Sequence, residues 1–170
     1  MKNIDNKINF RKFWSQPLRV ECSSKFQHIT TRTAGSRLWF VNNQRLEERI
    51  QAFLGLYQAK YQVEITSFKL MGNHYHLVAR FPLKNRAPFM RDLNARIAEA
   101  VRIIVPSYDH TGSFWEKRYS CQALVTDKAV LEKFIYSALQ PLTTGLYPEI
   151  DGYSTRCFLK SALSLSLIHI

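Results

Sequence analysis

Two histidines one residue apart, His74 and His76, have the type and spacing to hold a metal ion. They lie in a run that we expect to be a strand, and alternate strand residues share a face, so both imidazoles point the same way. Two imidazoles on one face bind divalent cations when a third ligand joins them. A His-x-His pair also arises by ordinary core packing, so it does not establish a metal site by itself.

A tyrosine and an amide further along the chain could complete the chemistry. Tyr136 and Gln140 are four residues apart in a stretch that we expect to be helical, so they share one helical face. A tyrosine hydroxyl, with a pKa of about 10, becomes a competent nucleophile when a metal polarises the phosphate it attacks or a base takes its proton. The Gln140 amide oxygen could give that metal a third, neutral ligand. The simpler alternative is that Tyr136 is one of eight tyrosines filling a core.

Apolar periodicity predicts the elements that position these groups. We expect strands at 25–33, 62–70, 75–81 and 119–125. We expect one helix after the cap Asn42-Asn43, a second running from about Phe89 to Ile104, and a third over 128–139, capped by Thr126-Asp127 and ended by Pro141.

The predicted order of elements, β-α-β-β-α-β-α, begins with the ferredoxin-like split βαβ arrangement. We therefore predict an α+β fold, in which one antiparallel ferredoxin-like sheet carries two helices on one face and an additional C-terminal helix bears Tyr136. The face with His74 and His76 is left for a substrate or for that third helix.

Composition favours a single packed domain with a polyanionic partner. The chain has 170 residues, 46% of them hydrophobic, and a net charge of +11 with a pI near 9.8. A merely basic surface would explain the charge equally well. Three scattered cysteines form no CxxC pair, which argues against a zinc knuckle and fits a reducing cytoplasm. Neither a signal peptide nor a long apolar run is visible, so we expect no membrane association.

Several segments resemble the signature of the single-tyrosine HUH transposases, of the REP-associated type within the insertion-sequence-200-like superfamily. The segment 71–78 is similar to that family's Met-Pro-Asn-His-x-His-Leu motif, and 112–119 to its Gly-x-x-Trp-x-x-Arg-Phe motif. The segment 134–141 is similar to its Arg-Tyr-Ile-x-Leu-Asn-Pro helix end, with Gly145-Leu146 at the expected offset. Segments 28–32 and 38–40 resemble its opening strand and next landmark, so the likeness spans about residues 26–150 in order.

The resemblance implies a role for each matching residue. His74, His76 and Gln140 would bind Mg²⁺ or Mn²⁺, and Tyr136 would attack a DNA phosphate to leave a 5′-phosphotyrosine and a free 3′-hydroxyl. The partner would be single-stranded DNA with a hairpin near the cleavage site. Some relatives are dimers in which each tyrosine serves the partner's site, so monomer and homodimer both remain open. A bacterial cytoplasmic, nucleoid-associated location follows from the same resemblance.

Other residues are weaker candidates for DNA contacts. Trp115 could stack on a base and Arg118 could hold a phosphate, although Trp115 is better explained as a core anchor. Arg91 and Arg96 could also contact DNA, but the solvated side of an amphipathic helix explains them more simply. His28 could approach the metal site, although a packed or surface histidine is the simpler expectation.

The same residues leave a second function open. A noncatalytic nucleic-acid-binding protein of this fold, such as a domesticated or decayed transposase, would keep the charge without the chemistry. Thr143-Thr144 stand where many relatives carry an arginine, which favours that alternative. Gly72 replaces the usual proline, and we expect this to affect only the turn.

We expect three regions along the chain: a basic N-terminal arm at 1–24, the transposase domain at 25–150, and a truncated tail at 151–170. The last six residues, Leu165-Ser166-Leu167-Ile168-His169-Ile170, can be encoded by CTG TCT CTT ATA CAC ATC, a string that reads like a sequencing-library adapter. We expect these six residues to derive from such an adapter, so His169 carries no functional weight.

Overall fold

The computed structural model describes residues 21–109 and 111–143. Its elements follow in the order β1 (Phe26–Arg32), η2 (Ala34–Ser36), α1 (Gln44–Tyr61), β2 (Glu64–Leu70), β3 (His74–Arg80), α2 (Arg86–Ile104), β4 (Ser120–Leu124) and α3 (Asp127–Thr143). Most of the expected arm at 1–24, the tail at 151–170 and the positions Thr144, Gly145 and Leu146 lie outside the described residues.

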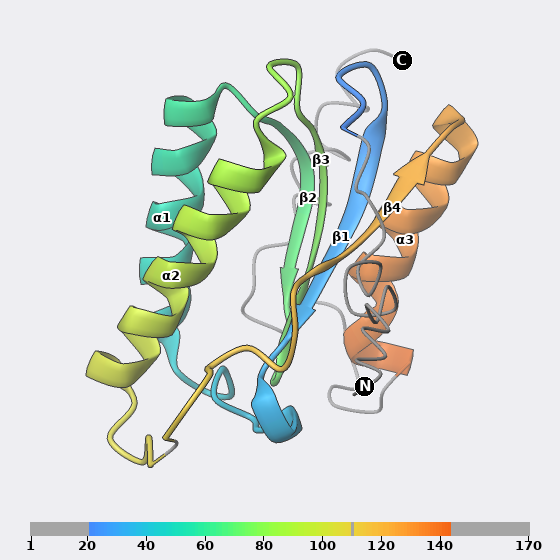
Figure 1. Ribbon diagram of the computed structural model, residues 1–170. Coiled ribbons are helices and arrows are strands. Elements are labelled where there is room, and N and C mark those ends of the chain that lie inside the picture. The colour runs from blue at the N-terminus through green and yellow to red at the C-terminus, as the bar shows by residue number, and fades with distance from the viewer. Residues whose placement is uncertain (1–20, 110, 144–170) are drawn as a thin grey trace, which may run out of the picture.

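The strands form one antiparallel sheet in the order β2-β3-β1-β4. Helices α1 and α2 pack side by side on one face of this sheet, and α3 lies against the other face (Figure 1). The α+β, ferredoxin-like prediction with an added C-terminal helix is therefore confirmed, and the third helix takes a place on the histidine face.

The hydrophobic core lies between the sheet and the α1–α2 layer. Alternate residues of β3, namely Tyr75, Leu77 and Ala79, are fully buried there. They meet fully buried side chains of α2, including Leu93 and Ile97, in one cluster. Each buried side chain of leucine size contributes about 1.5–3 kcal/mol, so this face of β3 is held firmly in register.

Side-chain caps set the starts of α1 and α3. The Asn43 side chain accepts a hydrogen bond of 3.0 Å from the backbone N–H of Leu46, as the sequence predicts. Thr126 likewise accepts from the N–H of Ala129 at 3.2 Å and opens α3. The prediction that Pro141 ends this helix is wrong, because α3 continues to Thr143. A proline beyond the first turn lacks the N–H that bonds to the carbonyl four residues earlier and its ring crowds that carbonyl, and α3 accommodates this cost within its last turn.

The β2–β3 connection is tight and passes under a neighbouring loop. The N–H of Met71 donates to the carbonyl of His74 at 2.8 Å, and the N–H of Phe40 donates to the carbonyl of Gly72 at 3.0 Å. A Cβ at Gly72 would lie 2.9 Å from Leu38 Cδ2 and 3.0 Å from Val41 Cγ2. The glycine therefore serves the packing of the loop above it as well as the turn. Within the described ranges, no helix combines the length and apolarity needed to cross a membrane.

Candidate active site

The two histidines of β3 project from the face of the sheet opposite the core. The antiparallel register pairs His76 with Thr30 and His74 with Arg32, so these four side chains share one face. The Nε2 atoms of His74 and His76 are 3.1 Å apart. The strand thus presents Tyr75, Leu77 and Ala79 to the core and its two imidazoles, together with Val78, to the other side.

Helix α3 brings the predicted tyrosine and amide to this same place. A cavity of about 580 Å³ is lined by His74 and His76 from β3 and by Tyr136 and Gln140 from α3. The remaining lining residues are Thr30, Thr31, Arg32, Glu116, Lys117, Arg118 and Ser120. Residues sixty or more positions apart in the sequence therefore meet in one pocket, which we call the histidine pocket.

Tyr136 is accessible and lies beside the histidine pair. Its ring meets that of His76 edge to face, with centroids 5.9 Å apart, and the residue is 48% exposed. The Lys133 ammonium lies 5.3 Å from the centroid of the Tyr136 ring. The next residue, Ser137, is buried and its Oγ lies 3.5 Å from Ser67 Oγ on β2. The helix is therefore anchored on the sheet while the phenol stays open to a substrate.

The hydrogen bonds of Asn73 fix the tautomer of His74. The Asn73 Nδ2 group donates to the carbonyl of Ser36 at 3.0 Å, which leaves its Oδ1 as the acceptor facing His74 Nδ1 at 2.7 Å. His74 Nδ1 must then carry the proton, so in the neutral ring Nε2 has a free lone pair. A hydrogen bond of this kind orients metal-binding histidines in general.

A third histidine contacts the pair from β1. His28 Nε2 lies 3.0 Å from His76 Nδ1, and the two rings are nearly coplanar, with centroids 5.2 Å apart and an angle of 5° between their planes. From the sequence, His28 was a residue that could approach the metal site, although a packed histidine was the simpler expectation. In the structure His28 is both buried and in contact with His76.

Burial keeps these imidazoles neutral near neutral pH. Loss of solvation, with a smaller effect of the Lys133 ammonium, lowers the pKa of His28 to about 4. Loss of solvation, reinforced by the neighbouring His74 and His28, lowers the pKa of His76 to about 3. The pKa of His74 is lowered as well, first by burial and then by the Arg32 guanidinium. Neutral imidazoles are the form that binds metals.

The donor set fits a divalent ion. Two ligands at right angles, each about 2.1 Å from a shared octahedral ion, lie about 3 Å apart, as the two Nε2 atoms do. In the part of the chain that the structure describes, no group of three or more His, Cys, Asp and Glu side chains is arranged for a metal. Beside the two imidazoles, the same pocket is lined by the Gln140 side chain, whose amide oxygen is a neutral donor of the kind a divalent ion accepts.

The predicted DNA contacts lie in different places. Arg118 lines the histidine pocket and also a neighbouring cavity of about 430 Å³, which Arg91 and Trp115 share. Trp115 is half-buried against the core, and its Nε1 donates to the carbonyl of Asn94 at 3.1 Å, which supports the anchor explanation. The Arg91 guanidinium pairs with Asp92 at 2.8 Å.

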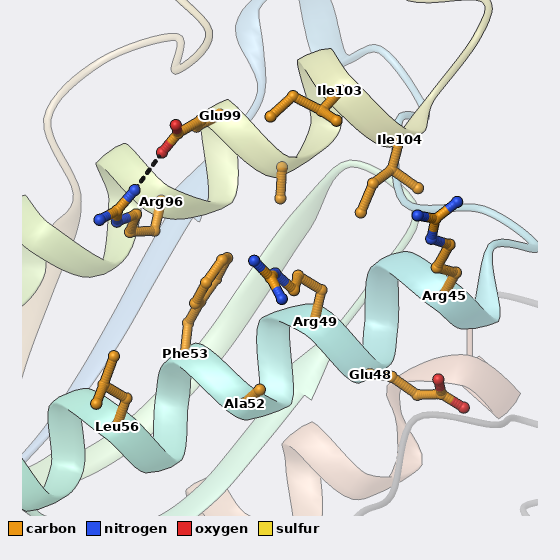
Figure 2. A pocket seen from close by; sticks show the side chains of 11 residues that line it. Arg45, Glu48, Arg49, Ala52, Phe53, Leu56, Arg96, Glu99, Ile103 and Ile104 are labelled. Atoms are coloured by element: carbon orange, nitrogen blue, oxygen red, sulfur yellow. Dashed lines mark hydrogen bonds and ion pairs between the residues drawn. The ribbon is translucent and has the colours of Figure 1, made fainter.

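Arg96 is remote from the histidines. It lies in a groove of about 630 Å³ between α1 and α2, on the other side of the sheet. Figure 2 shows its ion pair with Glu99, at 2.7 Å, and Phe53 and Arg49 projecting from α1 into the same groove. The amphipathic-surface explanation suits Arg96 best.

Sequence reasoning missed Arg32 and Lys133 as members of the site. Both lower the pKa of His76, so their positive potential reaches the place where a phosphate would bind. Arg32 could have been found from its spacing of two and four residues from Thr30 and His28 on one strand face. Lys133 lies three residues before Tyr136, which is one helical turn.

The comparisons with known proteins agree with this architecture. The family model described as IS200-like transposases matches residues 22–137, more than half of the chain. The solved structure of a REP-associated tyrosine transposase bound to a REP hairpin is similar, with a TM-score of 0.72 and 12% identity over 88% of this chain and 85% of that one. A candidate transposase of Deinococcus radiodurans R1 has a TM-score of 0.50 and 16% identity, over 71% and 95% of the two chains. No curated protein matches the chain in sequence. The protein belongs to the IS200-like transposase family.

Proposed function

We propose that this transposase cleaves and rejoins single-stranded DNA through a covalent bond between Tyr136 and a DNA phosphate. The observation that carries the proposal is the convergence of Tyr136, Gln140, His74 and His76 on one pocket. The tyrosine and amide come from a helix on the open face of the sheet, and the histidines come from the strand beneath it. Within the pocket, these groups stand where a phosphate could meet both nucleophile and metal ligands.

The reaction is a transesterification that conserves the number of phosphodiester bonds. The Tyr136 oxygen attacks phosphorus and loses its proton, the bond from phosphorus to the 3′ oxygen breaks, and that oxygen takes up a proton. The product is a 5′-phosphotyrosine and a free 3′-hydroxyl, which can reverse the reaction on the same or another strand. Rejoining therefore needs no nucleotide cofactor.

His74, His76 and Gln140 would hold Mg²⁺ or Mn²⁺, whose role when bound is to polarise the phosphate and to stabilise the charge on the departing oxygen. Asn73 holds His74 in the tautomer that leaves Nε2 free. Arg32, Lys117 and Arg118 line the same pocket and can attract the flanking phosphates.

We also propose that the substrate carries a hairpin and that Tyr136 acts within its own chain. The structurally similar REP-associated transposase is bound to a REP hairpin, which supports a hairpin-bearing substrate here. The Tyr136 ring contacts His76 of the same chain, which supports cleavage by a monomer. Mixing Tyr136→Phe protein with His74→Ala protein tests this point, because two such inactive partners restore cleavage only when sites are shared between chains.

The decisive experiment is a suicide-substrate assay. Protein and end-labelled single-stranded DNA from the flanking locus are incubated with Mn²⁺, and a covalent adduct is sought as an SDS-resistant shift. We expect an adduct with the wild type and none with Tyr136→Phe. Tyr57→Phe serves as the matched control, since Tyr57 is a buried tyrosine of α1 on the other side of the sheet. Tight DNA binding by folded wild type without any adduct would support the noncatalytic alternative instead.

A further inference from the structure

The histidine pocket contains a hydrogen-bonded row that continues beyond the two proposed metal ligands. His28 Nε2 faces His76 Nδ1 at 3.0 Å, His76 Nε2 faces His74 Nε2 at 3.1 Å, and His74 Nδ1 faces Asn73 Oδ1 at 2.7 Å. Since each contact needs one donor and one acceptor, the protons along the row depend on one another.

The direction of the row follows from its fixed end. Asn73 Oδ1 is an acceptor, so His74 carries its proton on Nδ1 and accepts at Nε2. His76 must then donate from Nε2, which leaves its Nδ1 as an acceptor for a proton on His28 Nε2. With three neutral rings, every one of these hydrogen bonds is satisfied in the protein without metal.

If both Nε2 atoms are to bind a metal, the protons on His76 and His28 must be placed differently. His76 Nε2 must give up its proton, so a neutral His76 carries the proton on Nδ1 instead. That N–H needs an acceptor, and the atom facing it is His28 Nε2. The bond between the two rings must therefore reverse its direction, with His28 protonated on Nδ1 in turn.

We propose that His28 is a positioning residue that sets the tautomer of His76: it donates to His76 in the metal-free protein and accepts from it when His76 serves as a ligand. The inference rests on the proposed function, because it assumes that the pair binds a divalent ion. Both rings remain neutral throughout, so one proton moves within each ring and none is gained or lost. The two rings are nearly coplanar, and the hydrogen bond from His28 therefore also holds the plane of His76 so that Nε2 points at His74.

Two substitutions separate the hydrogen bond from the packing of the His28 ring. His28→Phe keeps an aromatic ring against His76 and removes the bond. His28→Gln removes the ring but supplies an amide that can donate or accept after a flip. Gln122→Leu is the matched control, because Gln122 pairs with His28 across β1 and β4, shares its face of the sheet and is exposed.

The first readout is Mn²⁺ affinity without DNA, measured by electron paramagnetic resonance. Loss of an outer hydrogen bond to a ligand histidine typically weakens metal binding by about 10–100-fold, and we expect a loss of that size for His28→Phe. We expect His28→Gln and Gln122→Leu to bind within about threefold of the wild type, as variants that retain the bond should. Equal affinity of the Phe variant and the wild type would overturn the inference.

The second readout is the tautomer itself, seen by long-range proton–nitrogen NMR of isotope-labelled histidines. We expect His76 and His28 to be protonated on Nε2 without metal, and on Nδ1 once Mg²⁺ is bound. Unchanged tautomers at saturating Mg²⁺, with His74 and His76 both perturbed by the ion, would overturn the switch and leave the proposed function standing. A wild-type protein that binds neither Mn²⁺ nor Mg²⁺ would refute the metal site, and with it the proposed function. Independently of any metal, finding His76 protonated on Nδ1 in the metal-free wild type would overturn the inference about His28.

Discussion

Acidification should destabilise the metal-free protein at pH values where its carboxylates have not yet titrated. His28 and His76 have their pKa lowered by burial to about 4 and about 3, whereas a histidine in the unfolded chain titrates near 6.5. The unfolded state therefore binds protons first as the pH falls. Folding stability is lost as the pH drops below about 6.5, and the loss continues until the folded-state pKa values are reached.

The size of this effect follows from the two pKa differences. At about pH 5 the unfolded state holds nearly two protons more than the folded state on these groups, which is a slope of about 2.5 kcal/mol per pH unit. Integrated from about pH 7 to about pH 5, the two histidines together remove roughly 3–4 kcal/mol. That is a large part of the 5–15 kcal/mol, roughly, that stabilises an ordinary domain.

Urea unfolding in EDTA, followed by circular dichroism across this pH range, measures the effect. The reference is the double variant His28→Gln/His76→Gln, whose unfolded state cannot take up these two protons. We expect wild-type stability to fall steeply between about pH 6.5 and about pH 5, and that of the double variant, in which His74 still titrates, to fall clearly less. Parallel curves for the two proteins would refute the reasoning, because the imidazoles would then titrate alike in both states.

Three further substitutions test other contacts. Asn73→Ala should weaken Mn²⁺ binding by about tenfold or more, because His74 loses the acceptor that fixes its tautomer. Electron paramagnetic resonance measures this affinity, and an unchanged value would contradict the role of Asn73. Tyr75→Phe should reduce the free energy of unfolding in urea by about 1–2 kcal/mol, since the buried hydroxyl donates to Asn94 Oδ1 at 2.6 Å; a neutral effect would show that solvent replaces the donor. Gly72→Ala should cost less than about 1 kcal/mol, because the atom that its Cβ would meet at 2.9 Å is the terminal methyl of the exposed Leu38 side chain, which can turn aside. A much larger loss in urea unfolding would show that the loop cannot yield.

The order and faces of the elements could be predicted from local patterns. Hydrophobic periodicity indicates which side of each element is buried. It does so through the alternation of residues in β3 and, in α1, through the spacing of Leu46, Ile50, Leu54 and Tyr57. The end of α3 could not be predicted in this way, because Pro141 weakens the last turn locally while the packing of the helix on the sheet decides whether that turn forms. Gly72 shows a related limit, since its crowding comes from a loop more than thirty residues earlier.

The site was predictable where its members form local pairs. His74 with His76 and Tyr136 with Gln140 are recognisable by spacings of two and four residues. That the two pairs share a pocket depends on how α3 lies across the sheet, which no local spacing encodes. The contact between His28 and His76 depends on the register of β1 against β3, and the register appears only once the strands are paired.

The alternation along β3 has a consequence for folding fidelity. Tyr75 lies between His74 and His76 in the sequence, and it lies in the core while they lie in the pocket. A slip of β3 by one residue would turn the imidazoles into the core and the tyrosine and leucine out of it. The two Nε2 atoms can therefore share an ion only in chains whose strands have paired in the native register. The recovery of Mn²⁺ binding during refolding would then time the moment at which the sheet reaches that register, independently of any DNA.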